Sequence, residues 1–225
     1  MCGRFTLTMS YEELVEKFLI DEWVYEWGPR FNVAPSQAVL SLIIGKGQRM
    51  AGPIRWGLIP SWVKDQSKWK PLINARSETL EEKSSFKHLL NKRRTAILAD
   101  SFYEWKRKDG EKQPYRFMMK DKEPFAFAGL WDKQANDNSA AFSSTIITTS
   151  ANDLVQPVHD RMPVILKGEE SIKKWISTAD YTFNDVKELL VPFPSEFMTK
   201  YKVSQEVNST RNDFEACVKP LENLS

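Results

Sequence analysis

Short apolar runs, each ended by polar or glycine-containing turn residues, dominate the chain and predict many short β-strands. The sequence "GKG" at 45–47 is a turn that joins two of these runs into a hairpin. The sequences "KDGEK" and "NDNS" are further turn signals between later runs. The predicted strands occupy residues 38–44, 49–60, 95–105, 114–120, 124–131, 141–149, 161–167 and 198–208.

Helical patterns are fewer. Ser10 with Glu13 three residues later is a capping box, which predicts a helix start. Leu14, Phe18 and Leu19 then fall on one face of that helix, over residues 10–20. Three more segments have a helical pattern, at 84–93, 169–176 and 183–190.

Strands that follow one another closely through tight turns favour antiparallel pairing over the long crossovers of a parallel sheet. The chain has no internal repeat, low-complexity linker or composition shift that would mark a domain boundary. We therefore expect residues 1–225 to form a single α+β domain. Its sheet should be mainly antiparallel and barrel-like, with short flanking helices.

Composition narrows the class of protein. The 225 residues are enough for a well-buried core, and the net charge of +2 neither favours nor excludes a polyanionic partner. Cys2 and Cys217 lie at opposite ends, and with two distant histidines they make a poor metal ligand set, so we expect no metal and no cofactor. Neither a secretory signal nor an apolar run of about 18 residues is found, so we expect a cytoplasmic protein that does not enter a membrane.

The sequence "MCGRF" places a cysteine directly behind the initiator methionine. Removal of Met1 would leave Cys2 with its α-amine and thiol on adjacent carbons, a 1,2-aminothiol that can attack one electrophilic carbon twice. Chain ends are seldom packed, and a cation such as Arg4 would favour the thiolate. The alternative is that Cys2 is a buried, inert cysteine.

Two other residues are candidates for proton transfer. His159 lies in a loop before an apolar strand, where a histidine can move protons near neutral pH, although it can also be a simple turn residue. Glu104 lies between Tyr103 and Trp105 in a predicted strand, so its side chain should point away from both aromatic rings. A carboxyl beside an apolar wall has a raised pKa and can act as a general acid, whereas a solvated outer-face glutamate cannot.

Polar and aromatic residues between 56 and 77 could bind a nucleic acid. Asn74 and Arg76 supply donors that can hold an oxygen or a phosphate. The stretch "WGLIPSWVKDQSKWK" interleaves tryptophans, Trp69 among them, with lysines. Aromatic rings that stack on bases and cations that bind phosphates are what single-stranded DNA requires, although such clusters also occur on ordinary surfaces.

Eight segments occur in the order "MCGRF", "FNVAPSQ", "WGLIPSW", "NARSET", "FYEW", "AGLW", "TTSAN" and "HDRMPVIL". Together they resemble the signature of the SRAP family, the abasic-site-processing proteins first named SOS response-associated peptidases. The resemblance runs from Cys2 to about Leu166 and continues through "VSQEVN". Ser101 departs from the usual glycine before "FYEW", and Ala96 replaces a frequent cysteine.

The resemblance implies that Cys2 becomes the N-terminus and crosslinks to abasic sites in single-stranded DNA, with Asn74, Glu104 and His159 around it. It also implies a role in DNA binding for four residues in segments that family members use to hold the DNA: Arg4, Trp69, Arg76 and Trp105. We expect a monomer whose partner is single-stranded DNA.

Two other functions stay open at this stage. A thiol peptidase would use Cys2 as nucleophile and His159 as base, acting on its own leader or on other proteins. A noncatalytic module that binds single-stranded DNA would use the tryptophans and lysines and leave Cys2 incidental.

Overall fold

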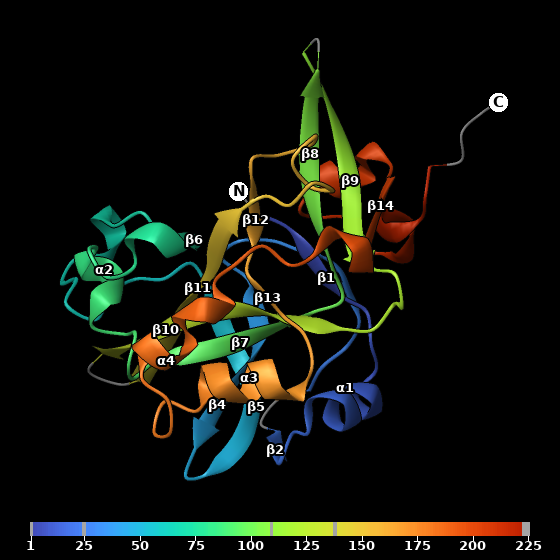
Figure 1. The fold of residues 1–225 in the computed structure, drawn as a ribbon. Helices are drawn as coiled ribbons and strands as arrows, with labels where there is room; N and C mark the ends of the chain where they lie inside the picture. The colour runs from blue at the N-terminus through green and yellow to red at the C-terminus, as the bar shows by residue number, and fades with distance from the viewer. Residues whose placement is uncertain (1, 24–25, 109, 137–138, 222–225) are drawn as a thin grey trace.

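The computed structural model describes residues 2–23, 26–108, 110–136 and 139–221, and most of its strands lie in two sheets. Figure 1 shows a ring of strands below and a smaller sheet with a long hairpin above. The ring consists of β4 (Ala38–Gly45), β5 (Gln48–Trp56), β7 (Arg94–Ala99), β10 (Phe125–Asn136) and β11 (Ser139–Ser150). The smaller sheet has the order β14 (Met198–Lys202), β9 (Glu111–Met119), β8 (Ser101–Lys108), β1 (Phe5–Leu7) and β3 (Arg30–Val33).

The ring closes through one parallel contact. Its neighbours pair antiparallel in the order β11-β10-β7-β4-β5. Strand β5 then returns to β11, with Arg55 opposite Ser143 and Trp56 opposite Ser144. The predicted class, α+β with a mainly antiparallel and barrel-like sheet, is therefore confirmed.

Short strands extend the edges of the ring. Strand β6 (Asn74–Arg76) runs parallel to β11 on one side, and β12 (Arg161–Pro163) runs antiparallel to it on the other. Strands β13 (Ile165–Leu166) and β2 (Glu22–Trp23) pair with β10 and β5. As a result, both residue segments that carry polar candidates, around 74 and 159, lie beside the same strand.

The helices are short and cover the ring. They are α1 (Tyr11–Phe18), α2 (Ser84–Lys87), α3 (Glu169–Ile176) and α4 (Phe183–Val186). The capping box of Ser10 and Glu13 is confirmed at the start of α1. The prediction of a helix over 84–93 is only partly right, because α2 ends at Lys87 and turns follow it. None of the helices in the described residues is long and apolar enough to cross a membrane.

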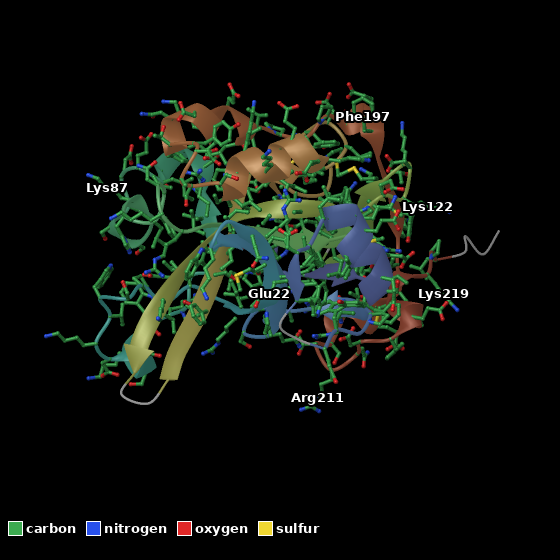
Figure 2. All side chains as sticks on the ribbon, turned by 90° about the horizontal axis from the view of Figure 1, so that it is seen from below. Glu22, Lys87, Lys122, Phe197, Arg211 and Lys219 are labelled. Carbon is green, nitrogen blue, oxygen red and sulfur yellow. The ribbon has the colours of Figure 1, made fainter. Side chains whose placement is uncertain are left out.

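The apolar core has two main parts. One lies inside the ring and under the helices, with Leu14 of α1 and Trp175 of α3 completely buried in it. The other lies between the ring and the smaller sheet, where the ring of Phe5 packs 5.3 Å from Trp56 and 5.4 Å from Phe127. Charged side chains, such as the labelled Lys87, Lys122 and Lys219, project from the periphery (Figure 2).

Asp100 forms the joint between the two sheets. The sequence predicted one strand over 95–105, but the chain bends at Asp100 and continues as β7 in one sheet and β8 in the other. The backbone N–H of Asp100 donates to the carbonyl of Thr6. Its carboxylate accepts hydrogen bonds from the Thr6 hydroxyl and from the backbone N–H and hydroxyl of Thr8, the last two at 2.6 Å.

A buried cation completes this joint. The guanidinium of Arg116 lies 3.8 Å from the Asp100 carboxylate and donates to the hydroxyls of Ser101 and Tyr201, both at 2.7 Å. The serine that departs from the family pattern therefore fits an extended strand and gains a hydroxyl contact with Arg116. These bonds fix β1 against β8.

We expect Asp100→Ala to lower the free energy of unfolding by about 3 kcal/mol. The change leaves the hydrogen-bond donors of Thr6 and Thr8 without an acceptor, and it leaves Arg116 without its anion. Urea denaturation followed by circular dichroism measures the change. Asp180→Ala, at an exposed position, is the control and should change stability by less than about 0.5 kcal/mol. Equal midpoints for the two variants would show that the carboxylate does not hold the joint.

Candidate functional site

Cys2 is held at a fixed place beside strand β8. Strand β1 pairs with β8 through Phe5 and Phe102, and the backbone N–H of Tyr103 donates to the carbonyl of Arg4 at 2.9 Å. The preceding residues therefore run along β8 toward Glu104. Cys2 has no exposed surface and belongs to the core between the two sheets.

Burial raises the pKa of the Cys2 thiol well above its usual range, and the nearby charge of Glu104 raises it further. The prediction that the charge of Arg4 makes the thiol ionise is wrong: at Arg4 it is a backbone hydrogen bond that lowers the thiol pKa, and burial outweighs it. The Arg4 guanidinium instead donates to Asn32 Oδ1 at 2.8 Å and to the carbonyl of Val207 at 2.6 Å. A cysteine peptidase depends on a thiol that ionises readily, and this site has the opposite property.

Asn74 contacts the backbone of Cys2 directly. Its side-chain N–H group donates to the Cys2 carbonyl at 2.8 Å. Strand β6 places it there, because Asn74 lies opposite Ile146 in the parallel pairing with β11. Arg76, two residues further along the same strand, points to the same side as Asn74 and is exposed.

Glu104 is almost completely buried, with 3% of its surface exposed. Burial is the main cause that raises its pKa to about 7, and the charge of Asp160 acts in the same direction. Tyr103 and Trp105 pack together in a separate apolar cluster, as the alternation along the strand predicted. Near neutral pH, Glu104 is therefore present in both its acid and its base form.

His159 lies in the loop between β11 and β12, as predicted from the sequence. Two contacts at Nδ1 favour different protonation states. The backbone N–H of Arg161 donates to Nδ1 at 3.0 Å, whereas Asp160 Oδ1, at 2.9 Å, stabilises a proton there. Burial, the largest influence, lowers the pKa of His159, so the neutral ring with its hydrogen on Nε2 is the main form at neutral pH.

A cavity of about 760 Å³ opens to solvent beside Glu104 and His159, whereas Cys2 and Asn74 do not line it. Its wall includes Glu104, His159 and Asp160, together with Arg4 and Trp105. The volume lies within the usual range for sites that bind small molecules or single nucleotides. Within the described residues, no group of His, Cys, Asp or Glu side chains is placed to hold a metal ion.

The predicted DNA contacts divide into two groups. Arg4 packs over the ring of Trp105, 5.7 Å from its centroid, and both residues line the cavity. Trp69 and Arg76 do not line it. Trp69 forms an edge-to-face pair with the half-exposed Trp62, with 5.2 Å between ring centroids.

Several residues of the site were not identified from the sequence. Asn208 accepts a hydrogen bond from the Trp105 indole at 2.6 Å, across 103 residues of chain. Arg161 donates to both carboxylate oxygens of Glu78, at 2.5 and 2.9 Å, and to the carbonyl of Thr148 at 2.7 Å. These contacts join segments far apart in the chain, so no local pattern signals them. Only the position of Arg161 inside "HDRMPVIL" could have suggested a role.

Comparison with known proteins places the chain in one family. The family model described as SOS response associated peptidase (SRAP) matches residues 1–210. The abasic site processing protein YoqW of Bacillus subtilis is 44% identical over 217 residues, which cover 95% of this chain and 96% of the relative. The abasic site processing protein HMCES of Gallus gallus is 32% identical over 265 residues, covering 99% of this chain and 78% of the relative.

Solved structures show the same fold. A protein from Bacteroides thetaiotaomicron superposes with a TM-score of 0.81 at 23% identity, covering 98% of this chain and all of that one. A phage-related protein from Bordetella bronchiseptica gives 0.72 at 28% identity, covering 95% of this chain and all of that one. The family model over residues 1–210 and the relatives at 44% and 32% identity show that the chain belongs to the SRAP family.

Proposed function

We propose that this protein, once Met1 is removed, captures abasic sites in single-stranded DNA by forming a thiazolidine through Cys2. The names of its relatives support abasic sites as the substrate. The observation that carries the proposal is the hydrogen bond from Asn74 to the Cys2 carbonyl, because it fixes the reacting residue next to the buried Glu104.

The first step joins the Cys2 amine to the sugar. An abasic deoxyribose is mainly a closed hemiacetal, and its ring-opened form carries an aldehyde at C1′. As the sugar opens, Glu104 protonates the ring oxygen and then takes up the proton that the 1′-hydroxyl loses when it becomes the aldehyde. The neutral amine attacks C1′, and one amine proton passes to the former aldehyde oxygen to form a neutral carbinolamine. A proton from Glu104 then lets the hydroxyl leave as water, which gives a protonated Schiff base (an iminium) and ionised Glu104.

The second step closes the thiazolidine. The thiol sulfur adds to C1′ of the iminium, so the C–S bond forms, the C=N π electrons move to the nitrogen, which keeps its hydrogen, and the thiol proton is lost. Glu104, ionised by its donation, takes up the thiol proton; its charge acts on the Cys2 thiol, whose pKa it raises. Because amine and thiol belong to one residue, this attack is intramolecular and gains the high effective concentration of proximity.

The remaining groups orient the Cys2 backbone, move protons and bind the DNA. Asn74 holds the Cys2 backbone, and His159 moves protons during closure and when the ring reopens. Arg4, Arg76, Trp69 and Trp105 contact the DNA around the lesion, so affinity falls as salt rises.

A covalent adduct with DNA should be visible as a gain in the mass of the protein. Protein that lacks Met1, incubated with an oligonucleotide carrying one abasic site, should gain the mass of the oligonucleotide minus one water by intact-mass spectrometry. Cys2→Ala should form no heat-stable adduct, and Cys2→Ser at most a weaker one. An unchanged adduct in Cys2→Ala protein would refute the assignment. Retained binding without an adduct in the wild type would instead favour a noncatalytic DNA-binding module.

The crosslinking rate should depend on pH through Glu104 and the α-amine. The crosslinking rate should rise with pH as the α-amine, with an ordinary pKa of about 8, loses its proton. It should fall again as Glu104, with a pKa of about 7, loses the proton it donates. The maximum therefore lies between about 7 and 8, and single-turnover rates measured across pH locate it.

Glu104→Gln removes the acid without removing the side-chain volume. We expect about a hundredfold slower crosslinking, loss of the decline at high pH, and DNA binding within a factor of about two. A parallel loss of binding and crosslinking, with an unchanged pH profile, would mean that Glu104 only supports the fold.

A further inference from the structure

Two cations face each other on the hairpin of β8 and β9. In the register of this hairpin, Arg107 lies directly opposite Lys112. Both side chains are exposed, and both line the cavity that contains Glu104 and His159. Lys106, the neighbour of Arg107, lines it too. Figure 1 shows this hairpin projecting from the body of the protein.

Such an arrangement is unfavourable in the free protein. Like charges directly opposite each other destabilise an antiparallel pair, and opposite charges stabilise it. Among the described residues, none forms a salt bridge with Lys106, Arg107 or Lys112. Within the described part of the hairpin, no salt bridge relieves this local repulsion.

The cavity wall is also positive as a whole. Its basic members are Arg4, Lys106, Arg107 and Lys112, and its acidic members in the described chain are Glu104 and Asp160. Glu104 is partly neutral near pH 7, and the Asp160 side chain is 86% exposed and lies against His159. The charge of Arg107 reaches the interior of the site, where it contributes to the lowered pKa of His159.

We propose that Arg107 and Lys112, supported by Lys106, form a phosphate subsite that binds the phosphodiester next to the abasic nucleotide. This inference rests on the proposed function and names residues that bring the sugar to Cys2. Arginine presents a planar fork that matches two phosphate oxygens, and lysine adds a compact charge. A phosphate between them would turn their repulsion into two attractions.

The test measures binding of an oligonucleotide that cannot form a crosslink. An oligonucleotide with one tetrahydrofuran residue mimics the abasic sugar but has no aldehyde, so its affinity is independent of crosslinking. Fluorescence anisotropy at several salt concentrations gives the slope of log K against log salt. The double variant Arg107→Gln/Lys112→Gln should reduce that slope by about 0.7 for each phosphate that the protein no longer neutralises, and should bind at least tenfold more weakly at low salt.

A matched control removes two charges elsewhere. Lys46 in the β4–β5 hairpin and Lys173 on α3 are both exposed, and these elements lie at the opposite end of the molecule from the β8–β9 hairpin (Figure 1). Lys46→Gln/Lys173→Gln makes the same change in net charge and should leave slope and affinity unchanged. Equal effects of the two double variants would overturn the subsite, because net charge alone would then explain them.

The position of the phosphate can be found by replacing one phosphodiester at a time with a neutral methylphosphonate. The wild type should lose affinity at one position beside the lesion, and the Arg107→Gln/Lys112→Gln protein should lose nothing further there. Losses spread evenly along the strand, or a loss that persists in the variant, would refute the subsite. Inorganic phosphate that competes as well as the oligonucleotide would show a general anion site instead and would also refute it.

The two proposals can fail separately. Binding with the expected slope change but no covalent adduct would refute the thiazolidine and keep the subsite. An adduct with no slope change would refute the subsite and keep the thiazolidine. Because the double variant removes a repulsion, it should melt at or above the wild-type temperature, so weaker binding would not reflect unfolding.

Discussion

The buried carboxylate of Asp100 is the interaction on which the arrangement of the site depends. It stands where the chain leaves the ring, and its bonds to Thr6 and Thr8 fix strand β1 beside β8. Cys2 lies just before β1, and Glu104 lies within β8. One anion in the core thus determines how a chain end meets a strand that begins about a hundred residues later. Burial then sets the chemistry, since it shifts the pKa of both Cys2 and Glu104.

The groups of the site are held in place by strand pairing and by hydrogen bonds. Asn74 and Glu104 come from strands, and both are held by pairing with neighbouring strands. His159 comes from a loop, but the backbone N–H of Arg161 fixes its ring, and Arg161 is anchored in turn by Glu78. Rigid placement suits a reaction in which one residue must present two nucleophiles to the same carbon.

Local patterns predicted the local parts of this structure. The capping box of α1 and the hairpin of β4 and β5 each depend on residues close in sequence. The break at Asp100 was missed because apolar residues continue across it. The ring closure by β5 and β11 joins residues about ninety positions apart, so no turn signal marks it. The motifs identified Cys2, Asn74, Glu104 and His159, but the opposition of Arg107 and Lys112 follows from strand register, which a sequence alone does not fix.

The complete burial of Cys2 has a further consequence for the resting protein. Oxidants and alkylating agents react with thiolates much faster than with thiols, and they must reach the sulfur to do so. A cysteine that is both neutral and enclosed stays reduced under conditions that consume exposed, acidic cysteines. In the proposed reaction the thiol would be used only after the substrate has engaged the amine, so the reactive residue would rest in a dormant form until then. Burial of this kind shields the sulfur from oxidants and alkylating agents, which are also agents that damage DNA.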